Sequence, residues 1–256
     1  HGSNTLDTAI AYGNSEQRLG DIGVDDWQII SKLPSIPDTC INITDWVMES
    51  VTASLRRLNA KKLRGLLLHR PMQLLDENGL ELYKAMKLIK TMGLAEKIGV
   101  SLYEPIELDL LWPHFKFDIV QIPFNILDRR WIDEGIIEKA QENNIQLFFR
   151  SIFLQGLIFL NKNELMSRKM NWAKTYLKEF NDLVKETPFS PLELAFGILT
   201  NVPGNNVIMM GIDSSNQLWE NLRILEKIKI DNKISDEWWS NLPVFPEKFL
   251  NPSLWN

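Results

Sequence analysis

Short apolar runs alternate with segments of helical periodicity along the whole chain, and this alternation limits the possible folds more than any other feature. The apolar runs are rich in β-branched residues, as buried parallel strands are. They lie at residues 5–9, 27–33, 63–69, 97–101, 119–123, 145–151 and 206–211. Strands that alternate with helices over a whole chain predict a parallel sheet with right-handed crossovers.

The segments between the runs carry one apolar face each. In residues 43–58, Val47, Val51, Leu55 and Leu58 recur at spacings of four, four and three, so this helix is expected to face a sheet. Three pairs have the residue types of a capping box at a helix start: Asn14 with Gln17, Ser190 with Glu193, and Ser214 with Gln217. No Pro-, Gly- or Ser-rich linker divides the chain, which predicts a single domain over residues 1–256.

Polar residues at the predicted strand ends favour a closed barrel over an open sheet. An open sheet that binds a dinucleotide is expected to carry G-x-G-x-x-G after its first strand, and this sequence lacks that motif. Polar or ionisable residues stand instead at the carboxyl ends of six strands: Asp7, Lys32, His69, Ser101, Gln121 and Ser151. In a (β/α)8 barrel, or TIM barrel, these ends converge on one mouth, where active sites of this fold lie.

Composition excludes several classes of partner. The net charge is -5 and the basic residues are not clustered, so neither nucleic acid nor an anionic membrane is expected as a main partner. No apolar run approaches the roughly 18 residues of a membrane-spanning helix, and no metal site is expected. The single cysteine, Cys40, fits a reducing compartment, and the first residues do not resemble a signal peptide. We therefore expect a cytoplasmic protein.

Several segments resemble the aldo-keto reductases, in the order in which that family carries them. The similar segments are residues 4–16, 30–33, 66–71, 99–101, 120–125, 150–156 and 211–221. Together they span nearly the whole chain. The resemblance implies an α/β fold of the TIM barrel type that binds NADPH in an extended form across the mouth, without a Rossmann domain. In the family, a further strand and helix precede the strand that carries Asp7, so the expected barrel is N-terminally incomplete.

The resemblance implies a catalytic group of Asp7, Tyr12, Lys32 and His69. Hydride arriving at a carbonyl carbon leaves negative charge on the oxygen, so the site needs a proton donor and groups that stabilise this oxygen. Tyr12 is the expected acid. A free phenol has a pKa near ~10, and the Lys32 ammonium would lower it by stabilising the phenolate. Asp7 would hold Lys32 in a buried ion pair, and neutral His69 would orient the carbonyl.

Each of these residues also has a plainer interpretation when taken alone. A tyrosine after a strand commonly packs with its hydroxyl satisfied. A lysine or aspartate at a strand end commonly meets solvent, and a lone histidine can belong to the core. It is the combination on successive strands that favours catalysis.

Further residues are implied to bind the cofactor. The resemblance assigns Ser101, Gln121 and Ser151 to its carboxamide and diphosphate, with Arg150 beside them. Two positions depart from the family. Leu102 stands where many members have Asn, and Arg150 stands where an aromatic side chain often stacks on the nicotinamide. The contacts at these two positions are therefore open.

A late segment is expected to bind phosphate. Gly211 ends a strand, and Ser214 and Ser215 open a helix whose free N–H groups and dipole favour an anion. The resemblance gives this segment the adenosine 2′-phosphate, with Gln217 and Asn221 near the adenine. However, Asp213 would repel a phosphate, and the first basic residue that follows is Arg223. NADPH is the expected cofactor, and NADH stays open.

The sequence thus predicts an NAD(P)H-dependent oxidoreductase that reduces an aldehyde or ketone to an alcohol. An alternative from another class is a catalytically silent cofactor-sensing or interaction subunit on the same fold. The small-molecule carbonyl substrate is left open among aldehydes, ketones and sugar-like carbonyls, because barrel loops set specificity. Oligomeric state is also left open.

Overall fold

A computed structural model describes residues 2–231 and 236–255 of the chain. The chain forms two compact units. The first unit contains residues 2–122 and 140–147, and the second contains the other described residues. Because the chain passes between the units more than once, neither unit is a continuous segment. The single domain expected over residues 1–256 stays a prediction.

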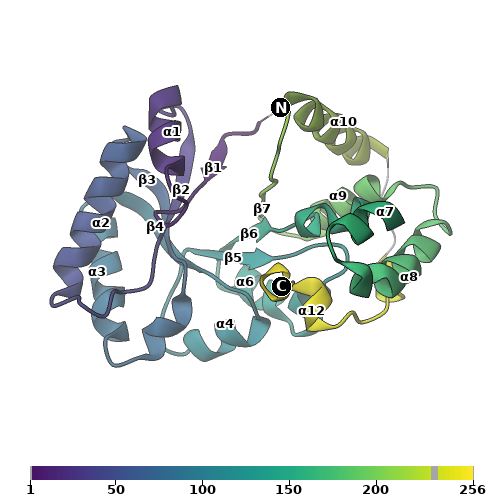
Figure 1. Cartoon of the computed structure of the whole chain (residues 1–256). Coiled ribbons are helices and arrows are strands. Elements are labelled where there is room, and N and C mark those ends of the chain that lie inside the picture. Colours follow the sequence, from purple (N-terminus) through teal and green to yellow (C-terminus); the bar gives the residue numbers. More distant parts are fainter. Residues whose placement is uncertain (1, 232–235, 256) are drawn as a thin grey trace. The chain divides into compact units, whose positions relative to one another are not determined.

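The first unit is built on parallel strands (Figure 1). These are β1 (Thr5–Asp7), β2 (Gln28–Leu33), β3 (Leu63–Leu68), β4 (Ala95–Ser101) and most of β5 (Ile119–Pro123). The register pairs Lys32 with Leu67, Leu67 with Gly99, and Ser101 with Gln121. Paired residues lie on the same face of a sheet. The register therefore puts Lys32, Ser101 and Gln121 on one face, near the carboxyl ends of their strands.

Helices cover the other face of these strands. They are α1 (Ser15–Ile22), α2 (Ile43–Leu58), the 3-10 helix η1 (Pro71–Leu75), α3 (Gly79–Thr91) and α4 (Pro105–Leu111), and α6 (Ile136–Glu142) straddles the two units. Helices α2 and α3 lie side by side (Figure 1). The apolar face predicted for residues 43–58 is confirmed, because Val47, Val51, Leu55 and Leu58 are all buried. Each such side chain contributes roughly 1.5–3 kcal/mol by leaving water.

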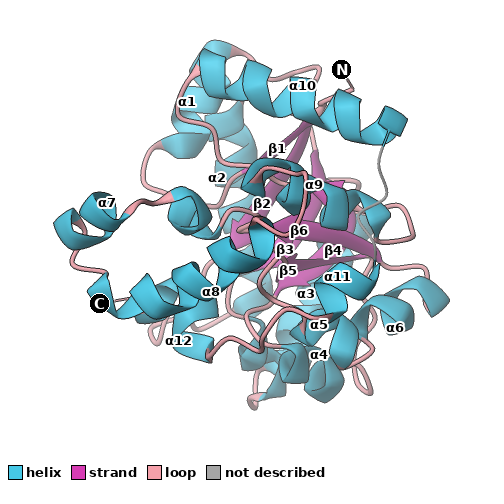
Figure 2. Cartoon of the chain, turned by 90° about the vertical axis from the view of Figure 1, so that its right-hand side faces the viewer, coloured by secondary structure: helices cyan, strands magenta, loops and turns pink. Residues whose placement is uncertain are grey.

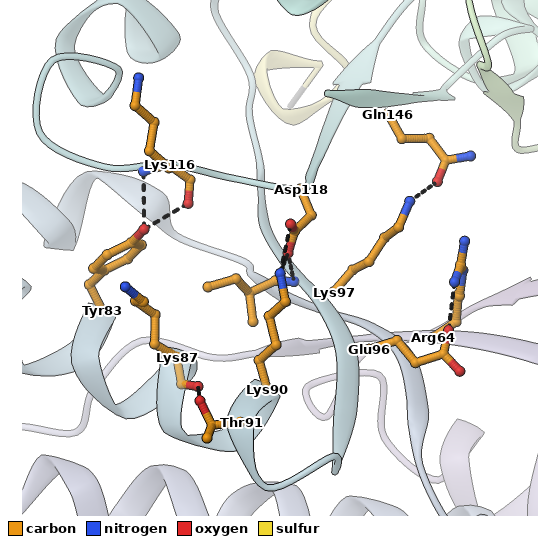
Figure 3. Close-up of polar contacts among 11 residues, drawn as sticks. Arg64, Tyr83, Lys87, Lys90, Thr91, Glu96, Lys97, Lys116, Asp118 and Gln146 are labelled. Atoms are coloured by element: carbon orange, nitrogen blue, oxygen red, sulfur yellow. Dashed lines mark hydrogen bonds and ion pairs between the residues drawn. The ribbon is translucent and has the colours of Figure 1, made fainter. Parts of the chain in front are cut away.

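Charged and polar side chains tie the amino ends of the strands of the first unit together (Figure 3). Arg64 at the start of β3 pairs with Glu96 of β4, and the Lys97 ammonium donates to Gln146 Oε1 at 2.8 Å. Burial, followed by the nearby Arg64 guanidinium, lowers the pKa of Lys97. This end of the sheet lies opposite the strand ends that carry Lys32 and Ser101. Residues at the amino ends of barrel strands commonly serve stability.

The second unit contains the end of β6 (Gln146–Arg150) and β7 (Val207–Ile208), which pair in parallel through Phe148 and Phe149. Its helical elements are α5 (Arg130–Asp133), η2 (Leu154–Phe159), α7 (Lys162–Ser167), η3 (Asn171–Ala173), α8 (Lys174–Val184), α9 (Pro191–Asn201), α10 (Ser215–Asp231), α11 (Asp236–Ser240), α12 (Glu247–Leu250) and η4 (Pro252–Leu254). Helices α8 and α12 lie side by side (Figure 2), with the Tyr176 and Phe249 rings 5.1 Å apart. Leu177, Phe180, Ile198 and Phe249 belong to one buried core cluster.

The predicted fold class is confirmed. All seven strands overlap the predicted segments, and they follow one another in sequence order in one sheet. Every strand pair whose register is described is parallel. This is the strand order of a (β/α)8 barrel that is incomplete by one βα unit. Among the described residues, no helix has the length and apolar character needed to cross a membrane.

The three predicted capping boxes have different outcomes. Ser190 and Glu193 form the box as predicted. The prediction at Asn14 is wrong, because its backbone has φ -97° and ψ 15° and its side chain caps nothing. Gln17 donates instead to Asp21 within the helix. At Ser214, the hydroxyl accepts from the Gln217 amide at 3.2 Å, while Gln217 Oε1 accepts from the amide of Asp213 rather than from that of Ser214.

Candidate active site

A buried ion pair lies at the carboxyl ends of β1 and β2. The Lys32 ammonium donates to both carboxylate oxygens of Asp7 at 2.7 Å and to the carbonyl oxygen of Thr8 at 2.9 Å. The Lys32 side chain is 1% exposed and that of Asp7 is 20% exposed. Moving an ammonium out of water is costly unless acceptors surround it. Here three acceptor atoms compensate the charge of Lys32.

Two aromatic rings lie beside this ion pair. The Lys32 Nζ atom is 5.3 Å from the centroid of the Tyr12 ring, and the Tyr12 and His69 rings are 5.5 Å apart in an edge-on arrangement. His69 directly follows β3, and its amide donates to the carbonyl oxygen of Leu33. Tyr12 is 46% exposed. The structure therefore brings Asp7, Tyr12, Lys32 and His69 together, while their catalytic roles stay a prediction.

A tight turn presents Tyr12 to the ion pair. After β1, the amides of Thr8 and Ile10 donate to the carbonyl oxygens of Ile30 and Lys32, so the pairing with β2 continues past Asp7. The Tyr12 amide then donates to Ala9, and the Ser15 amide donates to the Tyr12 carbonyl oxygen. These bonds close a turn at the start of α1. Tyr12 is thus held above the strand that carries Lys32.

Ser101 and Gln121 extend the site across the sheet. The Ser101 hydroxyl donates to Gln121 Oε1 at 3.0 Å, and Gln121 Nε2 donates to Asp7 Oδ1 at 3.0 Å. Both side chains are buried. A continuous chain of hydrogen bonds therefore joins β4 and β5 to the Asp7–Lys32 ion pair. The sequence predicts each residue at a strand end, but it gives no sign of this chain.

The other residues predicted to bind cofactor belong to the second unit. The Arg150 guanidinium lies 3.3 Å from the Ser151 hydroxyl and can donate to it. Ser151 has a φ of 57°, and positive values recur at Leu154, Gln155 and Gly156. Such a run of left-handed residues is costly for side chains other than glycine and is typical of functional loops.

Helix α10 begins with the predicted phosphate-binding residues. Gly211, Asp213, Ser214 and Ser215 are exposed. No atom lies within 4 Å of the position that a Cβ of Gly211 would take, so the space beside this backbone is open. Asn221 is 3% exposed, and its Nδ2 atom lies 3.6 Å from the Met210 sulfur.

The carboxylate of Glu16 is a buried acidic group near the site that the sequence analysis missed. It is 2% exposed and accepts hydrogen bonds from Ser31, Ser54 and Arg57. The available signal was its place in the first turn of α1, four residues after Tyr12. Among the described residues, no group of three or more His, Cys, Asp or Glu side chains is arranged to hold a metal ion.

Comparisons with known proteins identify the family and the fold. The family model described as "Aldo/keto reductase family" matches residues 1–239. The holo form of an aldo-keto reductase from Bacillus halodurans has a TM-score of 0.73 at 20% identity, over 98% of this chain and 84% of that one. An aldo-keto reductase from Klebsiella pneumoniae in complex with NADPH has a TM-score of 0.65 at 18% identity, over 93% of this chain and 78% of that one.

A third solved structure is similar over a comparable span. A thermostable aldo-keto reductase in complex with the inhibitor epalrestat has a TM-score of 0.67 at 24% identity, over 94% of this chain and 81% of that one. At these identities the structural likeness establishes the fold. No curated protein matches the sequence. The family model, which spans most of the chain, establishes that the protein belongs to the aldo/keto reductase family.

Proposed function

We propose that this protein is an NAD(P)H-dependent reductase that converts an aldehyde or ketone to an alcohol. The observation that carries the proposal is the buried Lys32 ammonium, held by Asp7 and lying against the Tyr12 ring. A buried lysine paired with a carboxylate is also found in purely structural networks. The half-exposed tyrosine beside it favours catalysis, because a proton donor must reach the substrate.

In the proposed reaction, Tyr12 is the general acid. When bound, the reduced nicotinamide supplies the hydride that the carbonyl carbon receives. Negative charge then grows on the carbonyl oxygen, and the Tyr12 hydroxyl donates its proton there. The Lys32 ammonium stabilises the phenolate that remains, since opposite charges attract strongly at a site with little water.

Asp7 and His69 assist from either side of Tyr12. Asp7 fixes the Lys32 side chain, which would otherwise have many rotamers, and it compensates the buried charge. His69, edge-on to the Tyr12 ring, donates from a ring nitrogen to the carbonyl oxygen and so orients the substrate. These roles agree with the positions of the four side chains in the first unit.

Each unit carries groups that suit a part of a nicotinamide dinucleotide. Ser101 and Gln121 form a buried hydroxyl–amide pair next to Asp7, which offers both donors and acceptors for a carboxamide. In the second unit, Arg150 and Ser151 would hold the diphosphate. At α10, Gly211 leaves open space, while Ser214 and Ser215 lie where helix amides lack intrahelical acceptors and attract phosphate.

Cofactor preference depends on the same helix start. Ser214 and Ser215 favour the 2′-phosphate of NADPH, whereas the exposed Asp213 opposes it. Gln217 and Asn221 complete the proposed adenine side. We propose NADPH as the cofactor and keep NADH as the alternative. A cytoplasmic location, supported by the single cysteine, is part of the same proposal.

The proposal is tested on the purified full chain with both reduced cofactors. Aliphatic aldehydes, aromatic aldehydes, ketones and aldoses are offered in turn, and the loss of reduced-cofactor absorbance is followed. Dissociation constants for each cofactor are measured in parallel by quenching of tryptophan fluorescence. We expect turnover of at least one carbonyl class. Tight cofactor binding without any turnover would contradict the proposal and favour a cofactor-sensing subunit.

A further inference from the structure

Four hydrogen bonds hold the buried carboxylate of Glu16. Glu16 Oε1 accepts from the Ser31 hydroxyl at 2.7 Å and from the Ser54 hydroxyl at 2.6 Å. Glu16 Oε2 accepts from Arg57 Nε at 2.8 Å and from Arg57 Nη2 at 2.6 Å. Burying a carboxylate is costly unless donors satisfy it, and this one has four. Both oxygens are therefore fixed in place.

This carboxylate joins three elements that surround the candidate site. Glu16 belongs to α1, Ser31 to β2, and Ser54 and Arg57 to α2. Ser31 directly precedes Lys32, and successive side chains of a strand point to opposite faces. Strand β2 is thus held on its helical face by Glu16 and on its inner face by Asp7.

Tyr12 is linked to the start of α1, the helix that carries Glu16. We call the contacts of Glu16 with β2 and α2 the Glu16 junction. The Ser15 amide donates to the Tyr12 carbonyl oxygen, and Ser15 is the first residue of α1. The Thr8 hydroxyl also lies 3.1 Å from the Ser15 hydroxyl. A shift of α1 against β2 would therefore move Tyr12 relative to Lys32.

We propose that Glu16 is a positioning residue for the reduction, which fixes Tyr12 relative to Lys32 by tying α1 to β2 through Ser31. This inference rests on the proposed function. Glu16 does not touch the reacting atoms. Its effect follows from geometry, because a misplacement of about 1 Å at a catalytic group lowers turnover by as much as ~10²-fold.

Two serines provide a matched test. Ser31 and Ser54 each donate one hydroxyl to the same oxygen of Glu16, and both are fully buried. Replacing either with alanine removes the same chemical group at a similar cost in stability. Only Ser31 belongs to the strand that carries Lys32. If Glu16 has only a structural role, the two variants should have equal effects on kcat. If Glu16 positions Tyr12, the effects on kcat should differ.

The kinetic experiment compares kcat, KM and the cofactor dissociation constant of wild type, Ser31→Ala and Ser54→Ala. We expect Ser31→Ala to lower kcat by about 10-fold and Ser54→Ala to change it by less than about 2-fold. KM and cofactor affinity should stay within about 2-fold in both, since neither serine is among the residues proposed to bind cofactor. Equal losses of kcat in the two variants, or a larger loss in Ser54→Ala, overturn the proposal.

A second measurement separates this inference from the proposed function. Hydrogen–deuterium exchange of residues 9–16 reports the turn that holds Tyr12, whether or not the chain turns over a substrate. Faster exchange of residues 9–16 in Ser31→Ala, with no change in Ser54→Ala, supports the positioning role of Glu16. Absence of turnover in the wild type refutes the proposed function alone. Unchanged exchange in Ser31→Ala refutes the positioning role alone.

Discussion

Replacing Asp7 with asparagine probes the ion pair on which the candidate site is built. The substitution keeps the size of the side chain and one acceptor oxygen, but it removes the negative charge opposite the Lys32 ammonium. In the wild type, Lys32 Nζ and Gln121 Nε2 both donate to Asp7. The amide NH2 group of the asparagine would face one of these two donors and could not accept from it. The Lys32 ammonium keeps its hydrogen bond to the Thr8 carbonyl oxygen.

The magnitude follows from the geometry. Two unit charges 2.7 Å apart attract by roughly 6 kcal/mol at an effective dielectric constant of about 20. Much of this attraction offsets the desolvation of both groups, and removing one partner of a fully buried pair costs about 3–5 kcal/mol. Asp7 is 20% exposed and asparagine still accepts one bond, so we expect a loss of about 2–3 kcal/mol. For a chain of this length, the midpoint of thermal unfolding should fall by roughly 5–10 °C.

The assay is urea unfolding followed by circular dichroism, with thermal unfolding as a second measure. Asp182→Asn is the control, because Asp182 forms an ion pair with Lys178 on the surface of α8. Exposed pairs contribute little, so the control should unfold like the wild type. An Asp7→Asn protein whose unfolding midpoint equals that of the wild type would refute the burial of a compensated charge at Lys32.

Three further predictions concern other parts of the chain. If the Asp213 carboxylate faces the ribose, Asp213→Asn should strengthen NADPH binding more than NADH binding, with a gain that shrinks as salt is raised. If the carboxylate points away, both affinities should stay unchanged. Titration with each cofactor at two salt concentrations decides between these outcomes, and weaker NADPH binding would contradict both. The Lys227 ammonium and the Ser190 amide lower the pKa of Glu193 from 4.5 to about 2. The stability from this pairing is therefore present above about pH 4.5 and is lost as the pH falls through about 2. The urea midpoint of Glu193→Gln should vary less over this pH range than that of the wild type. An equal dependence of the urea midpoint on pH in the two proteins would argue against the pairing. Leu58→Ala, at a fully buried position of α2, should lower the free energy of unfolding by about 2–5 kcal/mol, whereas Ile22→Ala, at an exposed position of α1, should unfold like the wild type.

Local patterns predicted most of the fold because they act over a few residues. The apolar face of residues 43–58 follows from helical periodicity, and helix α2 has these same bounds. The predicted box at Ser190 and Glu193 depends on residues three apart, and it is present. At Asn14, the turn that presents Tyr12 sets the backbone, so tertiary structure overrides the capping preference.

The residue pattern located the strand-end residues of the candidate site, whereas Tyr12, which lies in the turn after β1, was expected only through the family resemblance. The alternation of strands and helices locates the residues at which parallel strands end, and these residues meet in a barrel. The contacts among them depend on long-range geometry that no local pattern encodes. Gln121 donates to a residue 114 positions away, and Glu16 pairs with Arg57, 41 positions away. The sequence therefore indicated several residues of the site, but neither the hydrogen bonds among them nor the part played by Glu16.

The central claim, that Tyr12 donates the proton in a carbonyl reduction, is tested most directly by Tyr12→Phe. The substitution deletes one oxygen from a residue that is 46% exposed, so the fold and the cofactor site should be preserved. We predict that kcat with the best carbonyl substrate falls by at least ~10²-fold, while the cofactor dissociation constant stays within about 2-fold of the wild type. A Tyr12→Phe protein that reduces the same substrate at the wild-type rate would contradict the account.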